Sequence, residues 1–160
     1  MDTLIDTLMQ TDVETILRIL LSGFLGGLIG WERERHRNIV SAGIRTYGAI
    51  AIGACLFGAI SYYAGVHIPG TDSSRIAAQV VTGIGFLGGG IIFRHGDNVS
   101  GLTTAATLWA TASVGLAIAY GLYIIGITTA ILIYLLLCLS RLRWWRKVSP
   151  RLAKANSDMS

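Results

Sequence analysis

The sequence is poor in charge, and this scarcity bounds what the protein can be. Only 14% of its 160 residues are charged, whereas an ordinary soluble domain carries about 25%. No Lys or Arg precedes Arg18, so the acidic N-terminus lacks the basic start of a secretory signal. We therefore expect the first apolar segment to be retained. The two cysteines, Cys55 and Cys138, show no metal or redox spacing and are expected to be small packing residues.

Long apolar segments are abundant instead. Hydrophobic residues make up 52% of the chain and fall in runs nearly free of charge. A helix of ~20 residues, with a range of ~17–25, crosses the apolar core of a bilayer. The sequence therefore predicts an all-α, polytopic membrane helix bundle of about five transmembrane helices in a single domain. The predicted spans are residues 15–30, 45–64, 76–93, 102–119 and 122–139.

Basic residues predict the orientation of the bundle. Short loops rich in Lys and Arg stay in the cytoplasm. The net charge of +4 arises mainly from such loops and from the tail. We expect the N-terminus outside and the C-terminus inside, and no nucleic-acid partner, since neither a basic folded face nor a reading motif is present. The basic residues concerned are Arg33, Arg35, Arg37, Arg45, Arg94, Arg141, Arg143, Arg146, Lys147, Arg151 and Lys154.

The stretch GIGFLGGG at residues 83–90 matches G-x-G-x-x-G, which is the pattern of a dinucleotide-binding turn. That turn must follow a strand, and an acidic residue should come about 20 residues later to bind the ribose. Here the motif lies inside an apolar run, and the later stretch GLTTAATLW contains no acid. We therefore expect no nucleotide cofactor, and no other cofactor is expected.

Small residues at helical spacing give these glycines another role. In lipid, small residues let helix backbones approach closely, and residues three or four apart share a face. We predict close packing of the third span through one stripe and of the first span through two glycine pairs. The stripe is Ala78, Thr82, Gly85 and Gly89, and the pairs are Gly23/Gly27 and Gly26/Gly30. In the fourth span Thr104, Thr107 and Thr111 share a face opposite Trp109 and should bond to their own helix or to a neighbour.

Ionisable residues inside spans are functional candidates by default, yet all nine acids lie in loops, termini or span edges. We expect Arg18 to pair with Glu14 one turn earlier and to reach toward the interface. Two interpretations of the third span's start stay open. In the first, a polar vestibule at the outer face is lined by Asp72, Arg75, Gln79 and Thr82. In the second, Asp72 or Ser73 caps the helix, and Arg75 lies among the lipid headgroups.

The first loop alternates charge, with Glu32, Arg33, Glu34 and Arg35 in succession. A solvated loop whose arginines set the topology explains most of this pattern. A weaker hypothesis gathers Glu32 and Glu34 with His95 and Asp97 around Mg²⁺, which favours one or two carboxylates and retained waters. No nucleophile, base and orienting group form a catalytic triad, so we do not expect the protein to be an enzyme. The sequence does not identify the ligands of a metal site.

Three longer motifs resemble the MgtC/SapB family of bacterial inner-membrane proteins. They are GGLIGWERE with AGIRT, DSSRIAAQVVTGIGFLGGGIIFRHG, and NVSGLTTAATLWATASVGLAIAYGLY. The resemblance covers residues 23–123, with Ile44 and Ser73 where the family more often has leucine and proline.

The resemblance implies an accessory protein of the inner membrane that supports growth under magnesium limitation and, in some pathogens, survival in host cells. One member is associated with restraint of the ATP synthase. Many relatives carry a soluble cytosolic domain, whereas here we expect a membrane domain at 1–143 and a basic tail at 144–160 without that domain. The matching residues are Glu32, Arg33, Glu34, Arg45, Thr46, Asp72, Arg75, Gln79, Asn98, Thr103, Thr104 and Trp109.

Two classes of function follow. The first is a non-enzymatic protein that acts on membrane partners, with the lipid bilayer, a second copy of the chain, and an ATP synthase or transporter as expected partners. The second is a small transporter or channel for Mg²⁺ or another ion. The lack of a midplane acid favours the first, although backbone carbonyls and threonine hydroxyls can line a pore.

Overall fold

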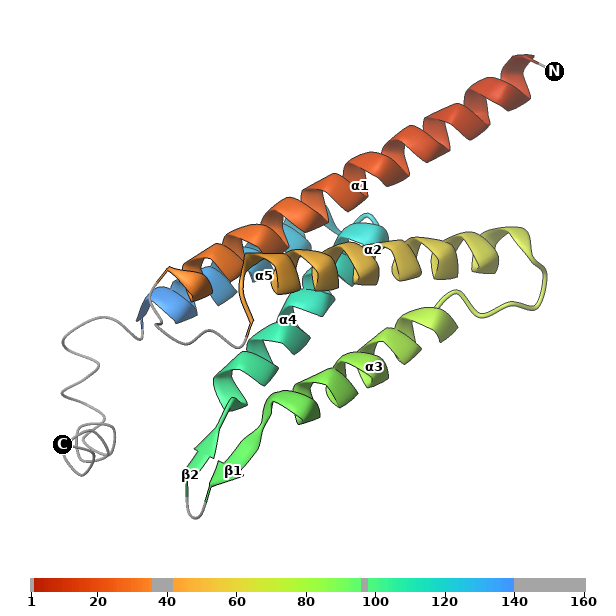
Figure 1. Cartoon of the computed structure of the whole chain (residues 1–160). Helices are drawn as coiled ribbons and strands as arrows, with labels where there is room; N and C mark the ends of the chain where they lie inside the picture. Colours follow the sequence, from red (N-terminus) through yellow and green to blue (C-terminus); the bar gives the residue numbers. More distant parts are fainter. Residues whose placement is uncertain (1, 36–41, 96–97, 140–160) are drawn as a thin grey trace.

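The protein is a bundle of helices in which a short antiparallel hairpin joins two neighbours (Figure 1). The computed structural model describes residues 2–35, 42–95 and 98–139. The predicted all-α class is confirmed, because the strands described have three residues each. In chain order the elements are α1 (Asp2–Glu34), α2 (Ile44–His67), α3 (Arg75–Ile91), β1 (Phe93–His95), β2 (Asn98–Ser100), α4 (Leu102–Ala119) and α5 (Tyr123–Leu139).

Among the described residues, three helices are long and apolar enough to cross a membrane, by length and composition: Asp12–Glu34 of α1, α2 and α4. The helices α3 and α5 are also apolar but have 17 residues each. At 1.5 Å per residue they extend about 25 Å, against a hydrocarbon core of about 30 Å. They therefore lie at the short end of the spanning range.

The ends of α1 differ most from the sequence-based expectation. The helix begins at Asp2, and its first turns extend past the other helices (Figure 1). It continues through Trp31 to Glu34, where the sequence predicts a loop. Tryptophan, glutamate and arginine all tolerate helical geometry, and no proline interrupts them. The amide of Arg35 still donates to the carbonyl of Trp31 at 2.9 Å.

The helix α4 is the centre of the bundle. It contacts α1, α2, α3 and α5, and half of its span is buried, against 28% for α1 and α2. A helix with apolar residues all round suits such a position. The hairpin leads from α3 into α4, and Gly101 ends it with a φ of 88°, a left-handed conformation that favours glycine.

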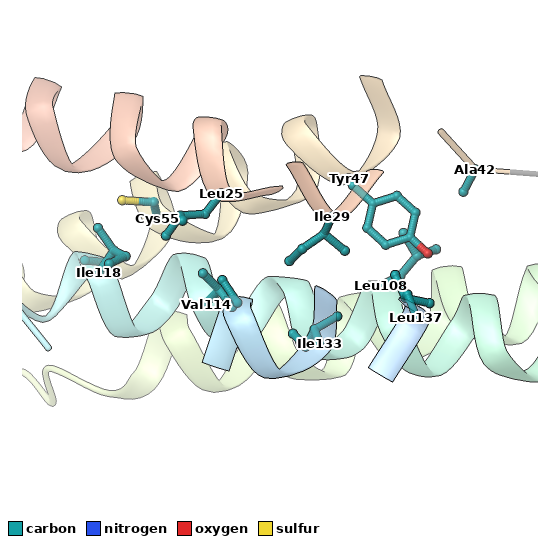
Figure 2. Packing of buried hydrophobic residues seen from close by; sticks show 12 residues of the cluster. Leu25, Ile29, Ala42, Tyr47, Cys55, Leu108, Val114, Ile118, Ile133 and Leu137 are labelled. Carbon is teal, nitrogen blue, oxygen red and sulfur yellow. The ribbon is translucent and has the colours of Figure 1, made fainter. Parts of the chain in front are cut away.

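The apolar core lies between α1, α2, α4 and α5. In Figure 2, Ile29 of α1 and Tyr47 of α2 lie near Leu108 of α4 and Leu137 of α5. Tyr47 has no exposed surface and is the largest fully buried side chain described. Its hydroxyl therefore needs a polar partner inside the bundle.

Glycines of α1 make the close contact with α2. A Cβ placed at Gly26 would lie 2.6 Å from the Cβ of Ala51, and one at Gly30 would lie 2.7 Å from the Cα of Ile44. The other pair is looser. A Cβ at Gly23 would lie 2.9 Å from the flexible side chain of Ile52, and one at Gly27 would make only ordinary contact. The backbones of α1 and α2 thus approach most closely along the Gly26/Gly30 face.

The predicted packing stripe of α3 is wrong within this chain. Ala78, Thr82, Gly85 and Gly89 are exposed, and a Cβ at Gly85 or Gly89 would meet nothing within 4 Å. The buried residues of α3 are Ile84 and Gly88 instead. Small residues at helical spacing occur on more than one face of GIGFLGGG, so the spacing alone does not identify the face that packs.

Candidate functional site

Buried and half-buried polar side chains join four helices near the end of α1. Glu32 and Arg33 occupy its last turn, and Glu32 is only 2% exposed. The Nη2 of Arg33 donates to the Oγ1 of Thr104 at 2.5 Å. The thiol of Cys138 on α5 donates to the Oε1 of Glu32 at 3.4 Å. Two residues expected in a solvated loop therefore point into the bundle, where a charged group needs polar partners.

A second bond extends this arrangement to α2. The hydroxyl of Tyr47 lies 2.6 Å from the Oγ1 of Thr107. Thr107 also donates to the carbonyl of Thr103 at 2.8 Å, and Thr111 donates to the carbonyl of Thr107 at 2.8 Å. These threonines therefore bond as expected, both back to carbonyls of their own helix and across to side chains of neighbouring helices. We call Glu32, Arg33, Tyr47, Thr104, Thr107 and Cys138 the polar cluster.

The sequence did not identify Tyr47 or Cys138 as members of this cluster. Tyr47 is 60 residues from Thr107, and Cys138 is 106 residues from Glu32. Neither separation produces a local pattern. The available signal for Tyr47 was its position within an apolar span, since a buried tyrosine hydroxyl usually finds a partner.

Glu34 has a different role from Glu32. Its Oε2 accepts a hydrogen bond at 3.0 Å from the amide of Ile44, the first residue of α2. A carboxylate at a helix N-terminus satisfies a free amide and interacts favourably with the helix dipole. Within the described part of the chain, no three His, Cys, Asp or Glu side chains form a metal-binding group. The predicted contributions of His95 and Asp97 lie outside the described side chains.

At the opposite end of the bundle, Asp72 orders the start of α3. Its Oδ1 accepts bonds at 2.8 Å from both the amide and the hydroxyl of Ser74. These two bonds, with a smaller contribution from the charge of Arg75, hold the pKa of the Asp72 carboxyl below its ordinary value. The N-cap of α3 is Ser74, without a side-chain cap bond, so the expectation that Asp72 or Ser73 caps the helix is wrong. Asp72 instead orders the turn that precedes α3. Arg75 is exposed as the first residue of α3.

The turn before α3 is held against the bundle by Ser73. Its carbonyl accepts bonds from the hydroxyl of Ser61 at 2.7 Å and from that of Tyr120 at 2.5 Å. Gly65 permits the approach, because a Cβ there would overlap Ser73. The α3 turn is therefore fixed to both α2 and α4 through one backbone carbonyl.

Arg18 forms the expected pair with Glu14, at 2.5 Å, but it does not only reach outward. Its Nη1 donates to the carbonyl of Ala119 at 2.5 Å and its Nε to the hydroxyl of Tyr123 at 2.9 Å. A cation at the C-terminus of α4 suits the helix dipole. Arg18 thus attaches α1 to the turn between α4 and α5.

Two grooves lie on either side of α2, and the adjacent residues Arg45 and Thr46 line one groove each. Arg45 lines a groove of about 680 Å³ between α1 and α2. Thr46 and Gln79 line one of about 530 Å³ between α2 and α3. Arg45 and Thr46 line different grooves because consecutive helical residues point about 100° apart. Arg45, Thr46 and Gln79 are all exposed.

The remaining candidates lie apart from one another. Thr103 and Trp109 are exposed on α4, whereas Thr104 is 1% exposed. Asn98 begins β2 opposite His95, and its side chain lies outside the described residues. The structure therefore brings together Glu32, Arg33 and Thr104, and leaves Arg45, Arg75 and Gln79 as separate exposed groups.

Comparison with known proteins places the chain in a family. A model of the MgtC family matches residues 19–143. The "Putative magnesium transporter YhiD" of Escherichia coli K12 is 43% identical over 114 residues, which are 68% of this chain and 52% of that protein. "Protein MgtC" of Brucella abortus strain 2308 is 52% identical over 98 residues, 59% of this chain and 38% of that protein.

"Protein MgtC" of Salmonella typhimurium is 44% identical over 106 residues, 66% of this chain and 43% of that protein. The chain spans about half, or less, of the length of these relatives. No solved structure matches it. The family match includes the second half of α1 and all of α2 to α5. With its apolar helices and this match, the chain is a membrane protein that belongs to the MgtC family.

Proposed function

We propose that the protein acts in the bacterial inner membrane as a non-enzymatic MgtC-type regulator that supports growth under magnesium limitation through membrane partners. The polar cluster is the observation that carries this proposal. Its side chains bond to one another between α1, α2, α4 and α5. Polar groups used in this way hold the bundle together, whereas a transport route needs them to face a water-filled path.

The groups available to a partner lie at the ends of the helices. Arg45 and Arg75 are exposed at the starts of α2 and α3, and Gln79 lies one turn into α3. A guanidinium can grip a carboxylate or phosphate through two parallel bonds, which lysine cannot reproduce. These three residues are therefore the ones proposed to contact a membrane partner.

The alternative function is transport of Mg²⁺ or another ion. It is supported by the name of the Escherichia coli relative, a putative magnesium transporter, and by the hydroxyl-rich face of α4, since threonine hydroxyls can line a pore. The two proposals differ in whether the purified chain moves Mg²⁺ across a bilayer.

Growth at low magnesium tests the proposed role. A strain lacking the gene should grow poorly in low magnesium and recover with the wild-type chain. Arg45→Lys, Arg75→Lys and Gln79→Leu should insert at normal levels yet fail to restore growth. Lysine keeps the charge and leucine suits the lipid, but neither can form the bonds of the residue it replaces. Arg94→Lys, at an arginine of the hairpin, is the matched control and should restore growth. Full growth with all three variants would mean that these residues only place the helices.

A further inference from the structure

The groove between α1 and α2 has walls that repeat every turn. Gly23, Gly27 and Trp31 line it from α1, and Ile44, Gly48 and Ile52 line it from α2. Residues four apart share a helix face, so each wall is a straight row along its helix. Each row covers nine residues, or about 12 Å at 1.5 Å per residue. That length is most of one leaflet, since the apolar core of a bilayer is about 30 Å thick.

Missing side chains keep this groove open. A Cβ at Gly27 would lie 3.8 Å from the Cγ1 of Ile44, and one at Gly48 would lie 3.8 Å from the carbonyl of Gly23. Both are ordinary contacts, so larger residues could begin to fill the space. The neighbouring Gly26 is different, because its face is already closed against Ala51. The groove is therefore an apolar space beside the Gly26–Ala51 contact that no side chain of α1 or α2 fills.

Cationic and aromatic groups gather at one end of the groove. Arg45 and Trp31 line this end, and the guanidinium of Arg35 lies 5.5 Å from the ring centroid of Trp31. Arg45 and Arg35 are both exposed. Tryptophan is enriched at headgroup depth in membranes, and arginine binds phosphate through charge-assisted bonds. By contrast, Thr46 and Gln79 supply the polar side chains that line the α2–α3 groove, and none of the described arginines lines it.

We propose that the α1–α2 groove binds one acyl chain of an anionic phospholipid, with the headgroup phosphate held by Arg45 and Arg35. Charge complementarity selects this occupant: the groove is apolar along its length, and its end has two exposed arginines beside one carboxylate, that of Glu34, which accepts a bond from the amide of Ile44. The basic loops assign this end to the cytoplasmic leaflet, where anionic headgroups attract arginine. This inference goes beyond the regulatory role and does not rest on it.

Native mass spectrometry of the purified chain tests the proposal, with phosphatidylglycerol and phosphatidylcholine supplied in equal amounts. Wild type should retain phosphatidylglycerol in preference to phosphatidylcholine. Arg45→Gln or Arg35→Gln should reduce that preference about fivefold each, and the double variant about 25-fold. Arg94→Gln removes an arginine elsewhere and should keep the full preference. Gly27→Leu should lower retention of phosphatidylglycerol, whereas Gly83→Leu in the α2–α3 groove should not.

Several results would overturn the assignment. Equal retention of the two lipids by wild type, or an unchanged preference in the double arginine variant, would remove the headgroup site. Displacement of phosphatidylglycerol by millimolar inorganic phosphate would indicate a free-anion site instead. A dimer that Gly27→Leu dissociates without changing lipid retention would assign the groove to a second copy of the chain. Since Arg45 and Arg35 are exposed, their variants remain informative even if Gly27→Leu fails to fold.

Discussion

Arg33 and Thr104 illustrate how this bundle accommodates polar side chains. The guanidinium leaves the last turn of α1 and bonds to a hydroxyl on α4 that is 1% exposed. A hydrogen bond to a charged group stabilises more than a neutral one, and a buried donor that loses its partner is costly. The contact therefore contributes to stability as well as to the relative placement of α1 and α4.

We expect Thr104→Val to lower the free energy of unfolding by about 1–2 kcal/mol, because valine keeps the shape and removes the acceptor. Unfolding in mixed detergent micelles measures the change. Thr103→Val is the matched control: its side chain is exposed on the same turn, and the variant should unfold like wild type. Equal stability of the two variants would show that the Arg33–Thr104 bond contributes nothing.

The sequence predicted only part of this site. It identified Glu32, Arg33 and Thr104 through motifs of the resembling family, but it placed the first two in a solvated loop. That placement failed because charge was taken as evidence of a loop, whereas helix-compatible residues extend α1 to Glu34. Tyr47 was missed because its partner Thr107 is 60 residues away, a separation that no local pattern encodes.

Helix positions were more predictable than helix contacts. The apolar runs predicted α4 with the bounds that the structure has, and α2, α3 and α5 within a few residues. Long runs without charge leave few alternatives in a membrane. The contact faces were harder, because small residues permit a close approach without specifying the neighbour. Gly26 and Gly30 lie against α2, whereas a Cβ at Gly85 or Gly89 would meet nothing within 4 Å.

Alanine substitutions separate these two kinds of glycine. Gly26→Ala places a Cβ 2.6 Å from that of Ala51, and overpacking of this kind costs about 1–3 kcal/mol. The variant should melt at a lower temperature in detergent and give a lower folded yield. Gly85→Ala adds a Cβ to open space and should melt at the wild-type temperature or slightly higher, since alanine favours a helix. Identical melting of the two variants would contradict the α1–α2 contact.

For the whole molecule, the basic residues of the sequence predict an outside N-terminus and an inside C-terminus. A phosphatase active only in the periplasm, fused after Ser160, should therefore be silent. The same enzyme fused within the turn at Pro69–Gly70, between α2 and α3, should be active. Activity patterns opposite to these would reverse the orientation and move Arg45 to the outer leaflet.

Transport of Mg²⁺ is the property that most directly separates the two proposed functions. The chain should be reconstituted into liposomes containing a magnesium-sensitive dye, from the same preparation that restores growth at low magnesium. Since the polar cluster is bonded within the bundle, a regulator predicts Mg²⁺ entry no faster than in protein-free liposomes. Saturable Mg²⁺ uptake that Arg45→Lys or Gln79→Leu abolishes would contradict the regulatory account and establish the transporter.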